Sequence, residues 1–193
     1  MSLTHVAQAQ ALASELERLQ KSHHPASICI LGCAGGNGLE KVDPIITKRV
    51  VAVDINPEYV DVAKKRFGKR YPTFQAIVQD IASGSSLACE PVDMVFAGLL
   101  LEYVPLRPAL HVIRGIAKKG TVVGSVLQRP SKDLPEVSPS PYSSLEVLAH
   151  QMKLVEPKEL VREAALFGLR FSDSHISVMP NGKELLMQVF RAE

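Results

Sequence analysis

A short apolar run that leads directly into a glycine-rich loop is the feature of this sequence that most restricts its fold. Residues 28–31 (ICIL) are followed, within seven positions, by Gly32, Gly35, Gly36 and Gly38. An unbroken apolar run of this length is typical of a strand buried on both faces, as in a parallel sheet between helical layers. Glycines let a ligand approach the backbone and permit a sharp turn. Because open α/β sheets bind small molecules at the carboxyl ends of their strands, the loop is a candidate ligand site; a glycine-rich turn without a ligand is the alternative.

The rest of the chain alternates between apolar strands and helices. Further strands are predicted at 49–54, at 74–80, within 92–103 and at 121–128. Helices are predicted over 4–20, over 39–47 with an interruption near Pro44, from Pro57 to about Arg70, over 107–120 with Gly120 as its stop, and over 156–168. Residues 169–192 form two extended runs joined at Asn181-Gly182, a strong hairpin signal. The pattern predicts a doubly wound α/β fold whose mostly parallel sheet ends in an antiparallel hairpin.

Length and composition favour one domain. A chain of 193 residues with 46% apolar content can bury a sizeable core but is short for two ordinary domains. We expect a single domain over 1–193, with a helical extension over 1–25 and a core over 26–193. No apolar run approaches the roughly 18 residues that cross a bilayer. The first residues lack the pattern of a secretory signal, so we expect a cytoplasmic protein.

Cysteines and charge argue against metal and nucleic acid. Cys29, Cys33 and Cys89 are odd in number and show no paired spacing, so neither disulfides nor a zinc site is indicated, and we expect no metal. The net charge is only +2, and the basic cluster at 64–70 (KKRFGKR) is more typical of a solvated helix end than of a nucleic-acid surface. The sequence gives no indication of the oligomeric state.

Asp54 is the first candidate ligand-binding side chain. It ends a predicted strand and precedes Asn56-Pro57, an N-cap and first-turn pair, so it faces the same sheet edge as the glycine loop. An ionised Asp can accept both hydroxyls of a ribose, each charge-assisted bond contributing about 1.5–3 kcal/mol. The alternative role as a helix cap is weakened because Asn56 fills it. Ile55 and Ile81 would offer apolar surface to the two faces of an adenine.

Two nucleotide motifs are not matched. The loop departs from the G-x-G-x-x-G pattern that places a pyrophosphate at a helix N-terminus, and no Gly-Lys-Ser or Gly-Lys-Thr closes it as in a P-loop. A nucleoside ligand without a phosphate requirement is therefore favoured. A nicotinamide-dependent oxidoreductase stays an alternative.

Four segments in order resemble the class I S-adenosylmethionine-dependent methyltransferases. They are LGCAGGNG (31–38), VVAVDINPEYV (50–60), IVQDIAS (77–83) and VDMVFAGLLLEYV (92–104). The resemblance covers most of residues 27–193, and the family's sheet also ends in an antiparallel strand. It implies that S-adenosylmethionine is the cofactor, with S-adenosylhomocysteine as product. The residues it places at the cofactor are Gly32, Cys33, Ala34, Gly36, Asn37, Asp54, Ile55, Asp80, Ile81, Ala97 and Gly98.

Within this resemblance, Asp54 holds the ribose hydroxyls and Asp80 reads the adenine amino group; for Asp80, an ordinary strand-ending Asp is the alternative. The sequence departs from the family at Ile30, where an acid that helps to hold the methionine ammonium is usual. Glu40 could substitute or be an exposed helix residue. The departure keeps open a non-catalytic S-adenosylmethionine-binding module.

Glu102 and Tyr103 follow the fourth strand and are implied by the resemblance to border the transferring methyl group. They are the candidates for a general base or a substrate contact, against the alternative of solvent-facing residues at a helix start. This region lacks the Asn-Pro-Pro-Tyr type of pattern found in many enzymes that methylate exocyclic base nitrogens. We therefore expect a small-molecule acceptor, and nucleic acid is disfavoured.

A long loop completes the predicted site. Residues 129–143 are rich in proline and longer than most connections in compact domains, which favours a lid or binding segment over the cofactor edge. With the amino-terminal helix and Tyr103, it is expected to cover the acceptor pocket, where Arg129, Tyr142 or His150 would orient a polar acceptor. A surface loop without ligand contact is the alternative.

Overall fold

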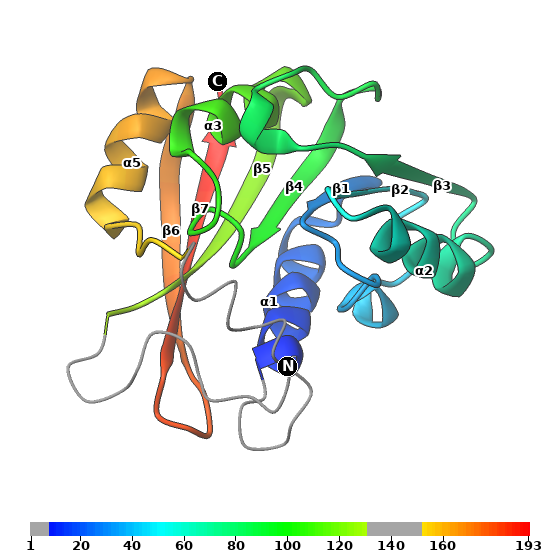
Figure 1. Cartoon of the computed structure of the whole chain (residues 1–193), viewed down its shortest axis with the longest axis horizontal. Helices are drawn as coiled ribbons and strands as arrows, with labels where there is room; N and C mark the ends of the chain where they lie inside the picture. The colour runs from blue at the N-terminus through cyan, green and yellow to red at the C-terminus, as the bar shows by residue number, and fades with distance from the viewer. Residues whose placement is uncertain (1–7, 131–151) are drawn as a thin grey trace.

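The computed structural model describes residues 8–130 and 152–193, which form a seven-stranded sheet between two helical layers (Figure 1). The strands are β1 (Ser27–Leu31), β2 (Arg49–Asp54), β3 (Thr73–Val78), β4 (Val92–Gly98), β5 (Ala117–Gln128), β6 (Leu169–Val178) and β7 (Glu184–Ala192). The helices are α1 (Gln8–His23), α2 (Pro57–Phe67), α3 (Leu106–Gly115) and α5 (Pro157–Leu166), with short 3-10 turns η1 (Leu39–Lys41) and η2 (Ile81–Ser83). The strand order is β3-β2-β1-β4-β5-β7-β6. Only β7 runs opposite to the other six strands, so the predicted doubly wound fold with a terminal hairpin is confirmed.

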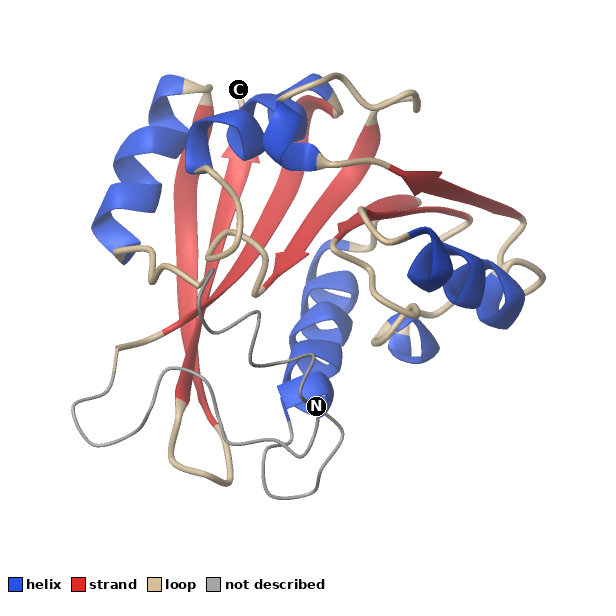
Figure 2. Ribbon diagram, viewed as in Figure 1, coloured by secondary structure: helices blue, strands red, loops and turns tan. Residues whose placement is uncertain are grey.

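Helices cover both faces of the sheet (Figure 2), and each face carries its own apolar core. Leu16 and Leu19 of α1 pack with Ala63 and Phe67 of α2 over one face. On the other face, apolar residues of α3 and α5 cover the same strands, among them Ile113 and Leu160. The strands between these layers are buried on both sides, which is why β1 reads as an unbroken apolar run.

The register brings the ends of three strands to one edge. Leu31 at the end of β1 pairs with Val53 of β2 and Ala97 of β4. The glycine loop, Asp54 and the segment after Gly98 therefore leave the sheet at the same carboxyl edge.

Most predicted elements are present, and β2 has the predicted bounds. The amino-terminal helix packs on the sheet as α1, although Thr4, its predicted cap, lies outside the described residues. The loop predicted over 129–143 also lies outside them from residue 131 onward. Among the described residues, no helix is long and apolar enough to cross a membrane.

Two predicted helices are wrong in extent. The helix expected over 39–47 is reduced to η1, because Gln20 of α1 holds the segment through both its amide atoms: Oε1 accepts from Asp43 N–H and Nε2 donates to Asp43 O. The helix expected to end at Gly120 ends at Gly115 instead.

Strand pairing explains why the helix expected to end at Gly120 is shorter. Ala117 already pairs with Val92, so β5 begins three residues before Gly120. Gly120 lies inside the strand with φ of 86°, beside the register shift between Val92 and Met94. A left-handed Gly signals a bulge as readily as a helix stop, and strand pairing decided between them.

Candidate cofactor and acceptor site

At two positions of the loop, a side chain would contact neighbouring residues closely, so glycine is required there. A Cβ on Gly36, whose φ is 81°, would lie 2.7 Å from the Phe67 ring, so this position lets α2 pack against the loop. A Cβ on Gly32, whose φ is 69°, would lie 3.1 Å from Leu100 Cδ1. Gly32 therefore admits the segment that follows β4, and the loop is closely packed on both sides.

Asp54 ties the glycine loop to the end of β2. Its Oδ2 accepts a hydrogen bond from Ala34 N–H at 2.8 Å, and its Oδ1 accepts one from Asn56 N–H at 3.0 Å. Asn56 caps α2 by accepting from Glu58 N–H, as predicted. A carboxylate offers about four acceptor positions. The half-buried Asp54 carboxylate thus fixes the loop and retains capacity for further donors.

Arg66 also holds the loop, and sequence reasoning missed it. Its Nη1 donates to Gly35 O at 2.6 Å and lies 3.4 Å from Asn37 Oδ1. The cluster at 64–70 lies at an exposed helix end, as predicted, but the contact of Arg66 with a loop carbonyl adds a role that the prediction did not include. The apolar spacing of Ala63 and Phe67 identifies the buried stripe of α2 beside Arg66, but no sequence signal showed that loop carbonyls face it.

Cys33 contributes backbone rather than thiol chemistry. Its N–H donates to Val53 O at 2.9 Å, and its side chain is buried. Burial, followed by the charge of Asp54, raises the pKa of the Cys33 thiol to about 12. The thiol is therefore protonated at neutral pH.

The residues predicted around the adenine differ in exposure. Ile55 is 64% exposed directly after β2, whereas Ile81 is 5% exposed and packs in the core beneath α3. The exposed Asp80 caps η2, its Oδ1 accepting from Ala82 N–H at 2.8 Å. Ile55 thus offers a free apolar surface, and Ile81 leaves little of its side chain for a ligand.

Glu102 is buried at the carboxyl edge between β4 and β5. Its Oε1 accepts from Gln128 N–H at 2.8 Å, beyond the point where β4 ends. Its Oε2 is buried and has no hydrogen-bond partner among the residues that the structure describes. Burial raises the pKa of Glu102 to about 7. The alternative of a solvent-facing residue is wrong for Glu102, whose exposure is 2%.

The segment around Glu102 is conformationally constrained. Leu99 has φ of 52°, uncommon for a residue with a Cβ, and its N–H donates to Val126 O. Tyr103 is half-buried, and its pKa is raised by burial and then by the negative charge of Glu102. Backbone held in sparsely populated regions is frequent at functional sites, so the segment suits a site role.

The remaining predicted positions serve packing. Ile30 is buried in the core under α1, where an acid would lack a described partner. Glu40 does not reach beyond the loop: its Oε2 accepts from Gly38 N–H at 3.1 Å. Ala97 is fully buried, and a Cβ on Gly98 would lie 3.2 Å from Leu12 of α1. These two residues can offer a ligand only backbone.

In residues 8–130 and 152–193, no group of three or more His, Cys, Asp or Glu side chains could hold a metal ion. The site is built from backbone, Asp54 and a buried carboxyl.

Comparison with known proteins identifies this arrangement. Residues 28–120 match the family model described as a methyltransferase domain. Residues 28–120 thus form a methyltransferase domain, which supports a class I methyltransferase. The family predicted from the four motifs is therefore confirmed, and the matched residues include the glycine loop, Asp54 and Glu102. No curated protein matches the sequence.

Solved structures share the methyltransferase fold at low identity. The N-methyltransferase NodS from Bradyrhizobium japonicum WM9, in complex with S-adenosyl-L-homocysteine, is 18% identical, with a TM-score of 0.71 over 95% of this chain and 86% of that chain. The Burkholderia thailandensis 1,6-didemethyltoxoflavin-N1-methyltransferase is 14% identical, with a TM-score of 0.69 over 95% and 78%. The [4+2]-cyclase SpnF is 13% identical, with a TM-score of 0.66 over 92% and 80%. The last shows that this fold also serves a protein named for another reaction.

Proposed function

We propose that this methyltransferase binds S-adenosylmethionine at the carboxyl edge of β1, β2 and β4 and transfers its methyl group in line to a small-molecule acceptor. The observation that carries the proposal is that two carboxyl groups, those of Asp54 and Glu102, both lie at that edge of the sheet. Asp54 holds the glycine loop and keeps acceptor capacity, and Glu102 has a buried oxygen without a partner in residues 8–130 and 152–193. A single-domain chain in the cytoplasm is part of the proposal.

The cofactor half of the site is assigned by chemistry. Asp54 accepts the ribose hydroxyls, Ile55 covers one adenine face, and Asp80 accepts from the adenine amino group while it caps η2. The backbone of residues 32–36 borders the methionine part. The bound sulfonium supplies a methyl group that is already activated, so the protein must chiefly align the acceptor and exclude water.

Glu102 is the proposed general base. With a pKa of about 7, a substantial fraction is ionised at neutral pH, and the ionised group can take a proton from an acceptor hydroxyl or amine. Tyr103, which is half-buried and follows Glu102 in the chain, is the proposed acceptor contact. The likeness to two N-methyltransferases supports a nitrogen-bearing small molecule as the first acceptor class to test.

A second function, a cofactor-binding protein that transfers no methyl group, is favoured by one observation. Ile30 places a buried apolar side chain where the family usually has an acid, and SpnF shares the fold under a different reaction name. The nicotinamide alternative has no comparable support.

Ligand-dependent melting of the full chain tests these functions. We expect S-adenosylmethionine and S-adenosylhomocysteine to raise the melting temperature and NAD to leave it unchanged. Release of S-adenosylhomocysteine in the presence of small amines and phenols then supports transfer. Binding without release for any acceptor would favour the second function, and stabilisation by NAD alone would reject the proposal.

A further inference from the structure

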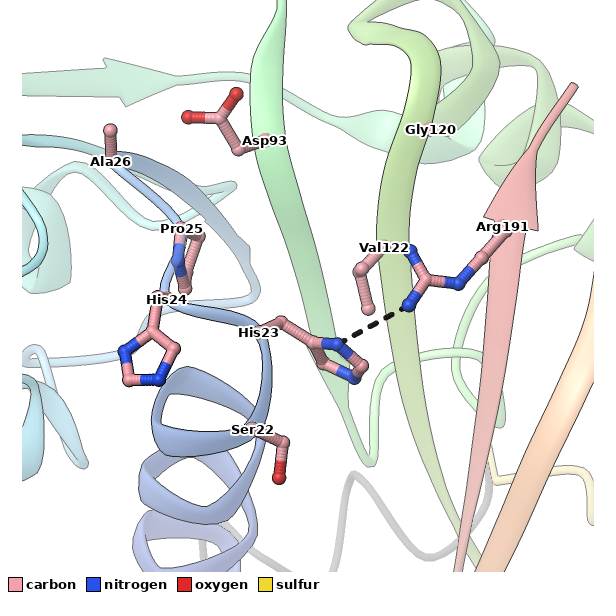
Figure 3. A pocket seen from close by; sticks show the side chains of 9 residues that line it. All are labelled: Ser22, His23, His24, Pro25, Ala26, Asp93, Gly120, Val122 and Arg191. Carbon is pink, nitrogen blue, oxygen red and sulfur yellow. Dashed lines mark hydrogen bonds between the residues drawn. The ribbon is translucent and has the colours of Figure 1, made fainter.

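A pocket opens at the opposite edge of the sheet, where the parallel strands begin (Figure 3). Its volume is about 520 Å³, and it lies between the end of α1, the starts of β1, β4 and β5, and the end of β7. Because β1 has five residues at about 3.3 Å each, this edge is about 16 Å from the cofactor edge. A ligand here would be independent of the proposed methyl transfer.

The pocket presents one arginine without an acidic partner. Arg191 reaches from β7 toward the His23 ring, with Nη2 3.5 Å from Nδ1 (Figure 3). It makes no ion pair within residues 8–130 and 152–193. Its cross-strand neighbour Arg170, in contrast, pairs with Glu193 at 3.2 Å.

The acid in the pocket wall is already neutralised. Asp93 accepts from the backbone and hydroxyl of Ser27 and forms an ion pair with Lys118 at 2.6 Å. Three metal-ligating side chains do not come together in the described part of the chain. Among the described residues that line the pocket, the charge available to a ligand is therefore the positive charge of Arg191.

His23 adds a hydrogen-bond donor. When Nδ1 accepts from Arg191, the proton of the neutral ring is on Nε2, which then donates. Burial lowers the pKa of His23, as do the charges of Arg191 and then Arg18, while Asp173 of β6 acts in the opposite direction. Ser22 contributes a hydroxyl to the same wall.

We propose that this pocket binds the carboxylate or phosphate group of a small molecule, with Arg191 as the fixed charge and His23 and Ser22 as further donors. Guanidinium groups match such oxyanions in geometry as well as in charge. A bound anion also favours protonated His23, so affinity increases as the pH falls between the pKa of the complex and the lower pKa of the free protein.

Proton NMR of the His23 ring in the full-length protein tests the proposal. The resonance is assigned with His23→Gln, and sulfate and acetate are titrated separately at constant ionic strength. Sulfate is the tetrahedral probe because its charge does not change between about pH 5 and 8, and acetate is the planar one. A saturable shift with either anion supports the site and shows which geometry it prefers.

Matched arginine variants decide the role of Arg191. We expect Arg191→Gln to weaken the affinity for the preferred anion about tenfold or more. Arg170→Gln removes the same charge from the neighbouring strand β6 and should change that affinity less than about twofold. In the unaltered chain, sulfate should bind more tightly at pH 6 than at pH 8. A linear, non-saturating shift with both anions, or equal losses in the two variants, would overturn the proposal.

Discussion

The Glu102 carboxyl group accepts a hydrogen bond from Gln128 N–H at 2.8 Å and thereby occupies the place beside β5 that β4 leaves when it ends at Gly98. This contact satisfies one oxygen and leaves the other buried without a partner in the described part of the chain. It joins the segment after β4 to the end of β5, next to the edge where Asp54 holds the glycine loop. A carboxyl group in this position is costly to ionise, which gives it testable consequences for both stability and catalysis.

The stability prediction for Glu102 follows from its raised pKa. The pKa is about 7 in the folded state against 4.5 for the unperturbed group. The contribution of the protonated Glu102 to the free energy of unfolding is therefore fully present below pH 4.5 and is lost as the pH rises through 7. We expect Glu102→Gln, which keeps an acceptor for Gln128 N–H, to be about 2–3 kcal/mol more stabilising at pH 8 than at pH 4.5. Urea unfolding at the two pH values measures this difference. An equal effect at both would contradict a buried, raised-pKa carboxyl.

The catalytic prediction uses the same variant. Once an acceptor is found, Glu102→Gln should lower kcat about 10²–10⁴-fold and abolish the pH dependence near 7, because the base is gone. S-adenosylhomocysteine affinity, measured by calorimetry, should stay within about twofold, since Glu102 is not assigned to the cofactor. Full activity in the variant would remove Glu102 from the mechanism.

We expect Asp54→Ala to weaken the affinity for S-adenosylmethionine and S-adenosylhomocysteine about tenfold or more. It should also destabilise the fold by about 1–3 kcal/mol, because Ala34 and Asn56 N–H lose their acceptor. Asp61→Ala, at an exposed position of α2, is the matched control and should change neither quantity. Calorimetry with both variants tests the assignment, and unchanged affinity in Asp54→Ala would sink it.

Gly32→Val and Gly36→Val should behave differently. The Phe67 ring lies 2.7 Å from a Cβ at Gly36, so we expect that variant to fold poorly. At Gly32 the nearest atom is the end of the flexible Leu100 side chain at 3.1 Å, so that variant should retain more structure and lose cofactor binding. Circular dichroism and calorimetry separate the two losses. Equal unfolding of both variants would leave a purely structural glycine turn as the explanation.

Arg66→Gln should weaken cofactor binding about threefold or more with little loss of stability, because it releases Gly35 O from its donor. Lys65→Gln removes the same charge from the neighbouring exposed position and is the control. If both variants lose affinity equally, general charge rather than the loop contact is responsible.

The predicted lid stays open to test by hydrogen exchange. If residues 129–143 cover the acceptor, their amides should exchange more slowly with S-adenosylhomocysteine and a methylated product analogue than without them. Identical exchange in both conditions would place the acceptor entrance elsewhere.

The sequence by itself determined which strands lead to the cofactor edge and which residues lie at their ends. Apolar runs buried on both faces leave a periodicity that needs no tertiary information, and Asn56-Pro57 marks a helix start by local chemistry alone. The glycine loop and Asp54 follow directly from those boundaries, and so does the family they resemble.

Only the tertiary structure decided which distant residues contact these segments. Hydrogen bonds between Gln20 of α1 and Asp43 hold a turn where a helix was predicted, and pairing of Ala117 with Val92 starts β5 before the predicted helix end at Gly120. Arg66 donates to a loop carbonyl 31 positions away along the chain. Glu102 is buried and accepts from Gln128 N–H, 26 positions away. Local propensity cannot encode such partners, because burial and pairing depend on which distant segments the fold brings together.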